Sequence, residues 1–204
     1  MPRISHNRPP AVPTTAEQRE RVVRILEAAE KHGAAKGLEH MQMVDVAKDA
    51  GVAIATLYRY FPSKTALFVG LMRHRIDELG TERLTTPGGE PWEAVSTLLV
   101  ISAQGLLDRP LLARAMLTSN NMSVVDRSGG PNQAPFHALI LREAEINDPT
   151  PGQERLLRLA EQTYYGILTS ALNGHIEVDE AQQDIELGGR LARLHLAADL
   201  LVAA

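Results

Sequence analysis

The chain has 204 residues, of which 44% are hydrophobic and only 4% aromatic, and it contains no cysteine. This composition favours helices over sheets, and the lack of cysteine excludes disulfides, thiolate metal sites and cysteine nucleophiles, as suits a reducing cytoplasm. The net charge of −4 is divided unevenly: residues 1–64 hold ten Lys and Arg against seven Asp and Glu, and residues 65–204 hold eleven against eighteen. A basic head on an acidic body is compatible with nucleic-acid binding.

Residues 1–14 contain four prolines and few apolar side chains, so we expect a flexible basic arm. The arm lacks the apolar core of a secretory signal, and no later run approaches the roughly 20 apolar residues that cross a bilayer. Two interpretations of the arm remain: Arg3 and Arg8 contact a DNA groove, or the arm is a plain tail. We expect a cytoplasmic protein with no membrane partner.

Three short helices are expected between residues 15 and 64. The first begins at Thr15, an N-cap with Gln18 at capping-box spacing, and glycines at 33 and 37 weaken and then end it. The second covers about residues 43–50 and the third about 53–61, with Gly51 between them. Two short helices joined by a tight turn form a helix-turn-helix, so residues 15–64 are the expected DNA-binding domain.

The rest of the chain, residues 65–204, is expected to form a helical ligand-binding and dimerisation domain. No segment alternates with the period of a strand, so the predicted fold is all-α, with about nine helices and no internal repeat. A loop rich in Ser, Asn, Gly and Pro is expected at residues 119–135. The expected helices cover about residues 64–83, 91–106, 110–118, 134–147, 152–172 and 180–202.

The helix-turn-helix carries the functional pattern. Val46, Val52 and Leu57 are expected to lock its two helices together by apolar contact, and Ala47 is small enough for a close crossing. The outward side of the second helix then carries small and polar residues, which suit a DNA major groove. These outward residues are Ala53, Ala55, Thr56, Tyr58 and Arg59.

The run Thr-Leu-Tyr-Arg-Tyr-Phe-Pro-Ser-Lys, residues 56–64, closely resembles the signature of the TetR family of transcriptional regulators. Val46-Ala47-x-x-Ala50-Gly51-Val52 resembles the first motif helix and turn of the same family, and the resemblance covers roughly residues 19–72. One departure concerns residues 53–55, Ala-Ile-Ala, where many members have Ser-Lys-Gly, so two polar contacts are lost.

The resemblance implies roles for single residues. Thr56, Tyr58 and Arg59 lie where family members contact bases and phosphates, and Tyr60 and Lys64 lie where phosphate contacts are common. Gln42 stands where many members carry a phosphate-binding Thr. The expected DNA-binding residues are Gln42, Ala53, Ala55, Thr56, Tyr58, Arg59, Tyr60 and Lys64.

A set of aromatic, Met and aliphatic residues in the body could line an apolar cavity for a small effector, the alternative being plain core packing. Gln42-Met43, Pro110-Leu111-Leu112 and Ala115-Met116 resemble the actinobacterial sterol-catabolism repressors, which implies a steroid or acyl-CoA-type effector. The candidate pocket residues are Trp92, Leu99, Met116, Met122, Phe136, Leu139, Ile140, Tyr164 and Tyr165.

The last two helices carry broad apolar faces, and small residues such as Gly188 and Gly189 allow close helix approach. Two such helices from each of two copies can form a four-helix interface, the alternative being burial within one protomer. A homodimer also places two recognition helices about 34–36 Å apart, at successive major grooves. The candidate interface residues are Leu168, Leu172, Leu187, Leu191, Leu194 and Ala198.

These patterns predict a ligand-responsive repressor that binds a palindromic operator and is released when a small apolar effector enters the body. Activation by a protein of the same family, or a helical lipid or small-molecule carrier without DNA binding, are the alternatives. An enzyme is not expected, because none of the seven histidines forms an HxxxH or HExxH pair and no Gly-rich phosphate loop appears. No metal and no cofactor are expected.

Overall fold

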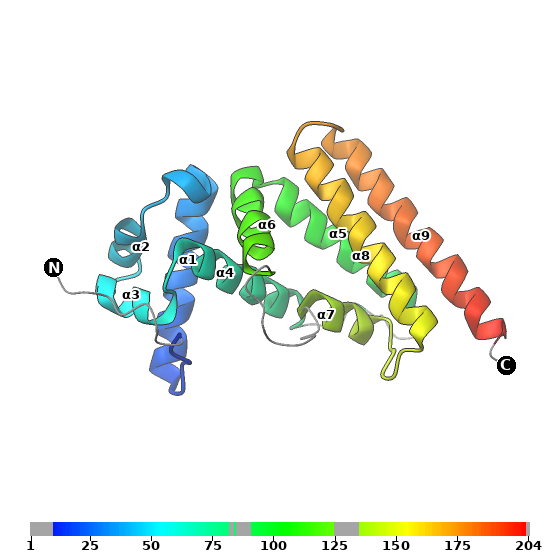
Figure 1. Cartoon of the computed structure of the whole chain (residues 1–204), viewed down its shortest axis with the longest axis horizontal. Helices are drawn as coiled ribbons and strands as arrows, with labels where there is room; N and C mark the ends of the chain where they lie inside the picture. Colours follow the sequence, from blue (N-terminus) through cyan, green and yellow to red (C-terminus); the bar gives the residue numbers. More distant parts are fainter. Residues whose placement is uncertain (1–9, 82–83, 85–90, 125–134, 203–204) are drawn as a thin grey trace. The chain divides into compact units, whose positions relative to one another are not determined.

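The computed structural model describes residues 10–81, 84, 91–124 and 135–202, with the side chains of residues 91, 92, 124 and 191–202 left out of the description. Within this part of the chain the structure has nine α-helices and no strand (Figure 1), which confirms the predicted all-α fold. The helices are α1 (Ala16–His40), α2 (Met43–Asp49), α3 (Ile54–Tyr60), α4 (Lys64–Leu79), α5 (Pro91–Leu107), α6 (Pro110–Val124), α7 (Pro135–Glu143), α8 (Pro151–Leu172) and α9 (Val178–Val202).

The helix starts follow from local capping chemistry. The Thr15 hydroxyl accepts a hydrogen bond from the Gln18 N–H at 3.2 Å, and the Ser63 hydroxyl accepts one from the Ala66 N–H at 3.0 Å. At the start of α8, Thr150 and Gln153 form a reciprocal capping box. Each cap satisfies an N–H group that the helix itself leaves without a partner.

Three predicted boundaries were wrong, the first of them at α4, which ends at Leu79 rather than near residue 83. Helix α6 continues to Val124, although a loop was expected from Ser119. Leu112, Met116 and Ser119 are all buried and lie at i, i+4 and i+7, so one buried face overrides the low helix preference of the Ser-Asn-Asn segment. Helix α7 ends at Glu143 rather than near residue 147, and Glu145 just beyond it has φ of +57°.

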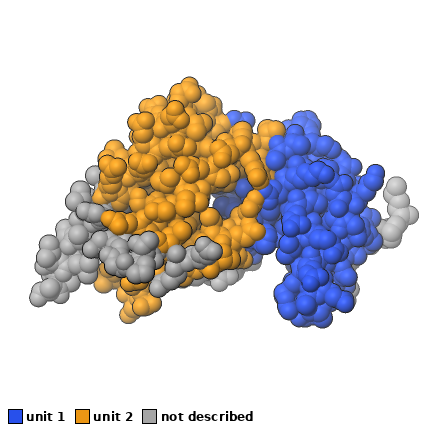
Figure 2. Space-filling model, turned by 180° about the vertical axis from the view of Figure 1, so that it is seen from behind, with its two compact units in different colours: residues 1–74, 114–128 blue, residues 75–113, 129–204 orange. Residues whose placement is uncertain are grey.

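The chain divides into two compact units (Figure 2). Unit 1 comprises residues 1–74 and 114–128, and unit 2 comprises residues 75–113 and 129–204. The units therefore divide inside α4 and α6, whereas the sequence suggested a single division at residue 64. Helix α4 passes without a break from unit 1 into unit 2.

The core of unit 1 is built from apolar residues of α1 to α4. Ile25, Leu57 and Phe68 are completely buried. Met41 and Met43 are 0% and 5% exposed, so both methionines belong to this core. Helix α2 packs against both α1 and α3.

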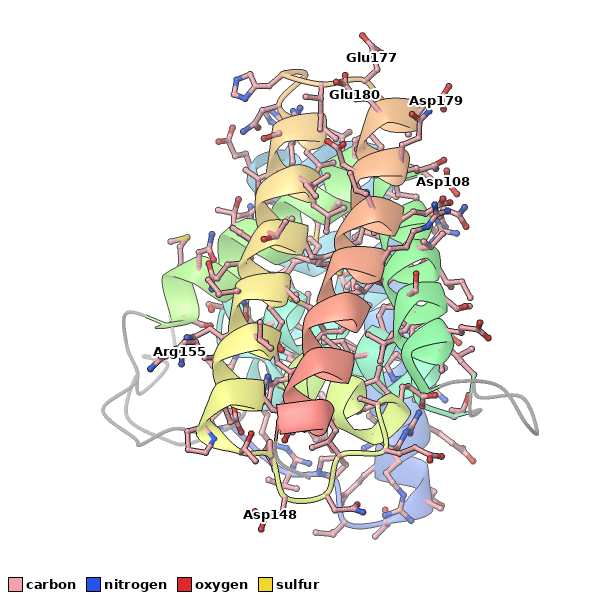
Figure 3. The ribbon with its side chains drawn as sticks, turned by 90° about the vertical axis from the view of Figure 1, so that its right-hand side faces the viewer. Asp108, Asp148, Arg155, Glu177, Asp179 and Glu180 are labelled. Carbon is pink, nitrogen blue, oxygen red and sulfur yellow. The ribbon has the colours of Figure 1, made fainter. Side chains whose placement is uncertain are left out.

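Unit 2 is a helical layer in which α9 packs against both α8 and α5 (Figure 3). Helix α9 approaches α5 closely at Gly189. A side chain at this position would not fit, since its Cβ atom would lie 2.9 Å from the Ser96 hydroxyl. Leu98, Leu157 and Leu168 form part of its buried core. Within the described residues no single helix is long and apolar enough to cross a membrane. Helices α5 and α6 reach that length and apolar content only when they are taken together, as a pair bent by 111°.

Candidate nucleic-acid interface and effector groove

The helix-turn-helix expected from the sequence is formed by α2 and α3. Its turn is closed by two backbone hydrogen bonds, in which the Gly51 N–H donates to the Lys48 carbonyl at 3.1 Å and the Val52 N–H donates to the Ala47 carbonyl at 3.0 Å. Gly51 has φ of +65°, in the left-handed region that glycine adopts without a steric penalty. The crossing of α2 and α3 therefore depends on this glycine.

The turn and the apolar lock decide which side of α3 faces solvent. Val46 and Leu57 are 0% exposed, as an apolar lock between the two helices requires, whereas Val52 is half-buried. The outward residues form a surface of small side chains followed by a hydroxyl, a phenol and a guanidinium. Ala53, Ala55 and Arg59 are exposed, and Thr56 and Tyr58 are half-buried.

Two expected contact residues are engaged within the head itself. The Lys64 ammonium donates to the Glu39 carbonyl at 2.9 Å and to the Leu38 carbonyl at 3.4 Å, so it ties the start of α4 to the end of α1. Tyr60 departs from expectation: it is only 4% exposed. Its hydroxyl accepts a hydrogen bond from Arg59 at 3.1 Å, and its ring lies 5.1 Å from the guanidinium, so Tyr60 orients Arg59.

Basic residues of α1 are also paired inside the head. Lys31 and His32 both contact the Asp49 carboxylate at 3.0 Å, and Lys36 contacts Asp45 at 3.0 Å. The hydrogen bond from Lys31, followed by that from His32, lowers the pKa of Asp49 below its usual value. These contacts fasten α2 to α1 and neutralise much of the positive charge on that side of the head.

The start of the described chain lies along α3. The Ala11 N–H donates to the Arg59 carbonyl at 2.9 Å, which satisfies an acceptor at the end of the helix. Arg3 and Arg8 lie outside the described residues. Gln42 is exposed at the N-cap of α2, where its side chain makes no capping hydrogen bond.

In unit 2 an apolar groove of about 290 Å³ opens between α5, α8 and α9. Gly188 helps to leave it open, since a Cβ atom there would meet nothing within 4 Å. None of the lining residues carries a charge. The lining residues are Leu99, Leu156, Leu159, Ala160, Thr163, Tyr164, Ile167, Ile185, Gly188 and Gly189.

The groove has one buried polar group. The Tyr164 and Ser102 hydroxyl oxygens lie 2.7 Å apart, and the Ser102 hydroxyl donates to the Leu99 carbonyl at 3.0 Å. Tyr164 is therefore the donor to Ser102, which leaves a lone pair on the phenol oxygen. Burial raises the pKa of Tyr164 far above its usual value, so the phenol is neutral at physiological pH.

The predicted pocket residues are only partly brought together. Leu99 and Tyr164 line the groove, and the Phe136 ring stacks on Tyr164 with ring centroids 5.6 Å apart. Met122 is 57% exposed and lies on the surface rather than in a cavity. Met116, Leu139 and Ile140 are buried, Tyr165 is half-buried, none of these four lines the groove, and the Trp92 side chain lies outside the described residues.

The predicted dimer residues also separate into groups. Leu168 and Leu172 are 1% and 6% exposed within one protomer, so they are core residues and offer no surface to a second copy. Leu187 on α9 is 53% exposed, and Leu159 on α8 is 57% exposed. The side chains of Leu191, Leu194 and Ala198 lie outside the described residues. Figure 3 shows α8 and α9 side by side, with Glu177, Asp179 and Glu180 where they join and Arg155 toward the other end of α8.

Sequence reasoning missed most of the groove lining. The signal was present on α8, whose broad apolar face was assigned to a dimer contact, although Leu156 and Ile167 on that face line the groove. Two stripes run along this helix, one buried at 157, 164, 168 and 172, and the other along the groove. Among the described residues no group of His, Cys, Asp or Glu is placed to hold a metal ion.

Both units match models of one family. Residues 25–71 match the model described as bacterial regulatory proteins of the tetR family, and residues 88–192 match the tetracyclin repressor-like C-terminal domain. The first match contains the whole helix-turn-helix. The second contains the groove and extends over more than half of the chain.

Individual proteins are similar over most of the chain. The HTH-type transcriptional repressor KstR of Mycolicibacterium smegmatis is 28% identical over 178 residues, which cover 85% of this chain and 87% of KstR. KstR of Rhodococcus jostii is 28% identical over 172 residues, or 83% and 81% of the two chains. A TetR transcriptional regulator from Rhodococcus sp. RHA1 has a crystal structure that is similar with a TM-score of 0.74 and 41% identity, covering 89% of this chain and 99% of that one.

The turn at Gly51 gives a prediction about stability. A Cβ atom at Gly51 would meet nothing within 4 Å, so Gly51→Ala changes only the backbone energy, and we expect it to lower the free energy of unfolding by about 1–2 kcal/mol. Gly105 is the matched control, because a Cβ atom there also meets nothing, and its backbone is right-handed. Gly105→Ala should raise the free energy of unfolding by about 0.5–1 kcal/mol. Urea denaturation measures both, and shifts of the same sign would contradict the role of Gly51.

Proposed function

The chain belongs to the TetR family of transcriptional regulators, and we propose that it is a repressor that binds a palindromic operator as a homodimer and leaves it when a small apolar effector binds. Repression rather than activation is supported by the similarity to KstR, which is named a repressor. Activation by the same DNA contacts is the alternative within the family.

The observation that carries DNA binding is the outward face of α3. Ala53 and Ala55 leave room for close approach to a groove, while Thr56 and Tyr58 supply hydroxyl groups for base edges and phosphates. Arg59 is held by Tyr60 near the end of the helix, a position suited to a phosphate. A small-molecule carrier without DNA binding would leave this surface without a use.

We propose that α8 and α9 form the dimer interface. Leu159 and Leu187 expose large apolar side chains on this face, and a second copy would remove both from water. A dimer supplies the second recognition helix that a palindrome requires. Leu168 and Leu172 are buried in each protomer, so the exposed side chains of Leu159 and Leu187 replace them in this proposal.

We propose that the groove at Tyr164 holds the effector. Its volume of about 290 Å³ is near the lower end of ligand pockets, and its lining is apolar. A CoA moiety carries phosphates, which need cationic partners, and the lining offers none. An uncharged steroid whose one oxygen donates to the phenol of Tyr164 therefore fits better than an acyl-CoA.

Release from DNA requires a link between the groove and the head. Helix α4 is that link in the chain, since it enters both units. An effector can shift the protein off DNA only by as much as it prefers the off-DNA state, which for a strong response is several kcal/mol. A modest tilt of α4 would misplace one recognition helix relative to its groove.

The DNA-binding proposal is tested with an operator selected from a pool of random duplexes. We expect Tyr58→Ala to weaken binding by about 1–3 kcal/mol, and Arg59→Gln to weaken it for all sequences and to lower the salt slope by about 1. Fluorescence anisotropy at several salt concentrations measures both quantities. Arg155→Gln on α8 removes the same charge from the other unit and should leave binding unchanged. Folded Tyr58 and Arg59 variants with wild-type affinity and salt slope would refute the interface.

The dimer proposal is tested by placing a negative charge at Leu159 or at Leu187. Leu159→Glu and Leu187→Glu should each raise the dimer dissociation constant at least about tenfold, since about 1.4 kcal/mol is a small part of the cost of an unpaired interface charge. Sedimentation velocity over a range of concentrations measures the constant. Leu111→Glu is the control, because Leu111 is 44% exposed but lies on α6. Dimers unaffected by both α8 and α9 variants would place the interface elsewhere.

The effector proposal is tested with pregnenolone, a steroid whose hydroxyl group can donate to Tyr164, and with lauroyl-CoA as an acyl-CoA probe. We expect pregnenolone to raise the melting temperature and to release the operator, and lauroyl-CoA to do neither. Tyr164→Phe removes one neutral hydrogen bond, about 1 kcal/mol, and should weaken pregnenolone binding several-fold. Tyr165→Phe is the neighbouring control and should bind as the wild type does. Release by lauroyl-CoA alone would contradict the steroid assignment.

A further inference from the structure

We propose that α7 couples the effector groove to α4, through an ion pair of Arg142 and Glu143 that clamps the chain at the end of α4. This inference rests on the proposed function, because it assigns a route by which a change at the groove reaches the DNA-binding head. Its parts are all in unit 2: the end of α4, the groove and the whole of α7.

The clamp consists of two adjacent residues of α7, Arg142 and Glu143, which hold two backbone atoms of the chain that follows α4. The Arg142 guanidinium donates to the Gly80 carbonyl at 2.6 Å, directly after the last residue of α4. Glu143 accepts a hydrogen bond from the Leu84 N–H at 3.0 Å and one from the Arg142 Nε at 2.9 Å. One ion pair therefore fixes both Gly80 and Leu84 to the end of α7.

The burial of Glu143 separates this pair from an ordinary surface salt bridge. Its side chain is 0% exposed, whereas carboxylates are almost never fully buried without partners. A buried ion pair contributes little to stability compared with apolar residues of the same volume, but breaking it by removing one partner is strongly destabilising. Stability alone is thus a poor reason for a charged pair at this place.

Gly80 gives independent support for a tight fit. A Cβ atom at this position would lie 3.2 Å from the Arg142 guanidinium and 3.4 Å from the Leu139 side chain. Both atoms belong to α7, so α7 packs closely against the chain directly after α4. In this proposal a shift of α7 moves the chain at Gly80, because the contact between them is tight.

The other end of α7 is attached to the groove helix. Phe136 stacks on Tyr164, which lines the groove. His137 lies between two carboxylates of α8, with Nδ1 at 2.6 Å from Glu161 and Nε2 at 3.3 Å from Glu154. Since α7 has only nine residues, the groove contacts and the clamp are about two helical turns apart on one short rigid element.

The geometry gives a direction of action. An effector that contacts Tyr164 displaces the stacked Phe136, α7 moves as one body, and the clamp passes the movement to Gly80 and so to α4. Because coupling between two sites is reciprocal, DNA bound to the head must also change the state of α7. The reciprocal direction can be measured without knowing the natural effector.

The experiment uses the full-length protein and the operator selected from random duplexes. Hydrogen exchange of the amides at residues 139–143 is compared with and without this duplex. In the wild type, we expect DNA to change their exchange rates by about fivefold or more, the lower end of typical coupling factors. A purely structural ion pair would not make α7 respond to DNA.

Two variants remove the clamp to different degrees. Arg142→Met with Glu143→Leu replaces the buried pair by apolar side chains, which such sites commonly tolerate, and should bind the duplex while α7 no longer responds. Arg142→Lys keeps a cation beside Glu143 but loses the planar fork that also reaches Gly80, and should reduce the response. Glu186→Gln with Arg190→Gln removes an exposed ion pair on α9 and should respond as the wild type does.

Each outcome decides the proposal. A wild-type response that disappears in the double variant and weakens in Arg142→Lys supports the clamp. DNA binding without any wild-type response, or a full response in the double variant, overturns the clamp alone. If the double variant does not fold, an undiminished response in Arg142→Lys overturns it. A wild type that binds no duplex in the pool overturns the proposed function, and the clamp with it.

Discussion

The orientation of α3 depends on the burial of Val46 on α2 and Leu57 on α3, two helices that are joined by the turn at Gly51. These two side chains are completely buried, so rotation of α3 about its axis would expose them to water. The same burial that stabilises the head therefore directs Thr56, Tyr58 and Arg59 away from the core. In the proposed function, recognition and stability share this cause, and a change at the turn affects both.

Charge has a smaller part in the head than its composition suggests. Lys31, Lys36 and Lys64 all contact acceptors within unit 1, where they join α1 to α2 and α4. Part of the positive excess in the sequence is therefore used in contacts within the head.

The body uses apolar and charged contacts for different purposes. The groove is lined by uncharged residues and has a single phenol, which suits an apolar molecule with one polar oxygen. Carboxylate contacts occur instead at α7, where His137 joins α8 and the ion pair of Arg142 and Glu143 joins the chain after α4. In the proposed mechanism, effector binding and its transmission to α4 are thus carried by neighbouring but chemically distinct contacts.

The sequence by itself determined the helices, the family and the outward face of α3, because capping residues, glycine turns and apolar periodicity act over a few neighbouring residues. It could not determine which of two apolar stripes on α8 is buried, nor that Tyr60 turns inward. Only the tertiary structure decided that Leu168 belongs to the core and that Glu143 meets a chain segment about sixty residues away. Such contacts depend on how distant helices pack, and a local pattern carries no record of that packing.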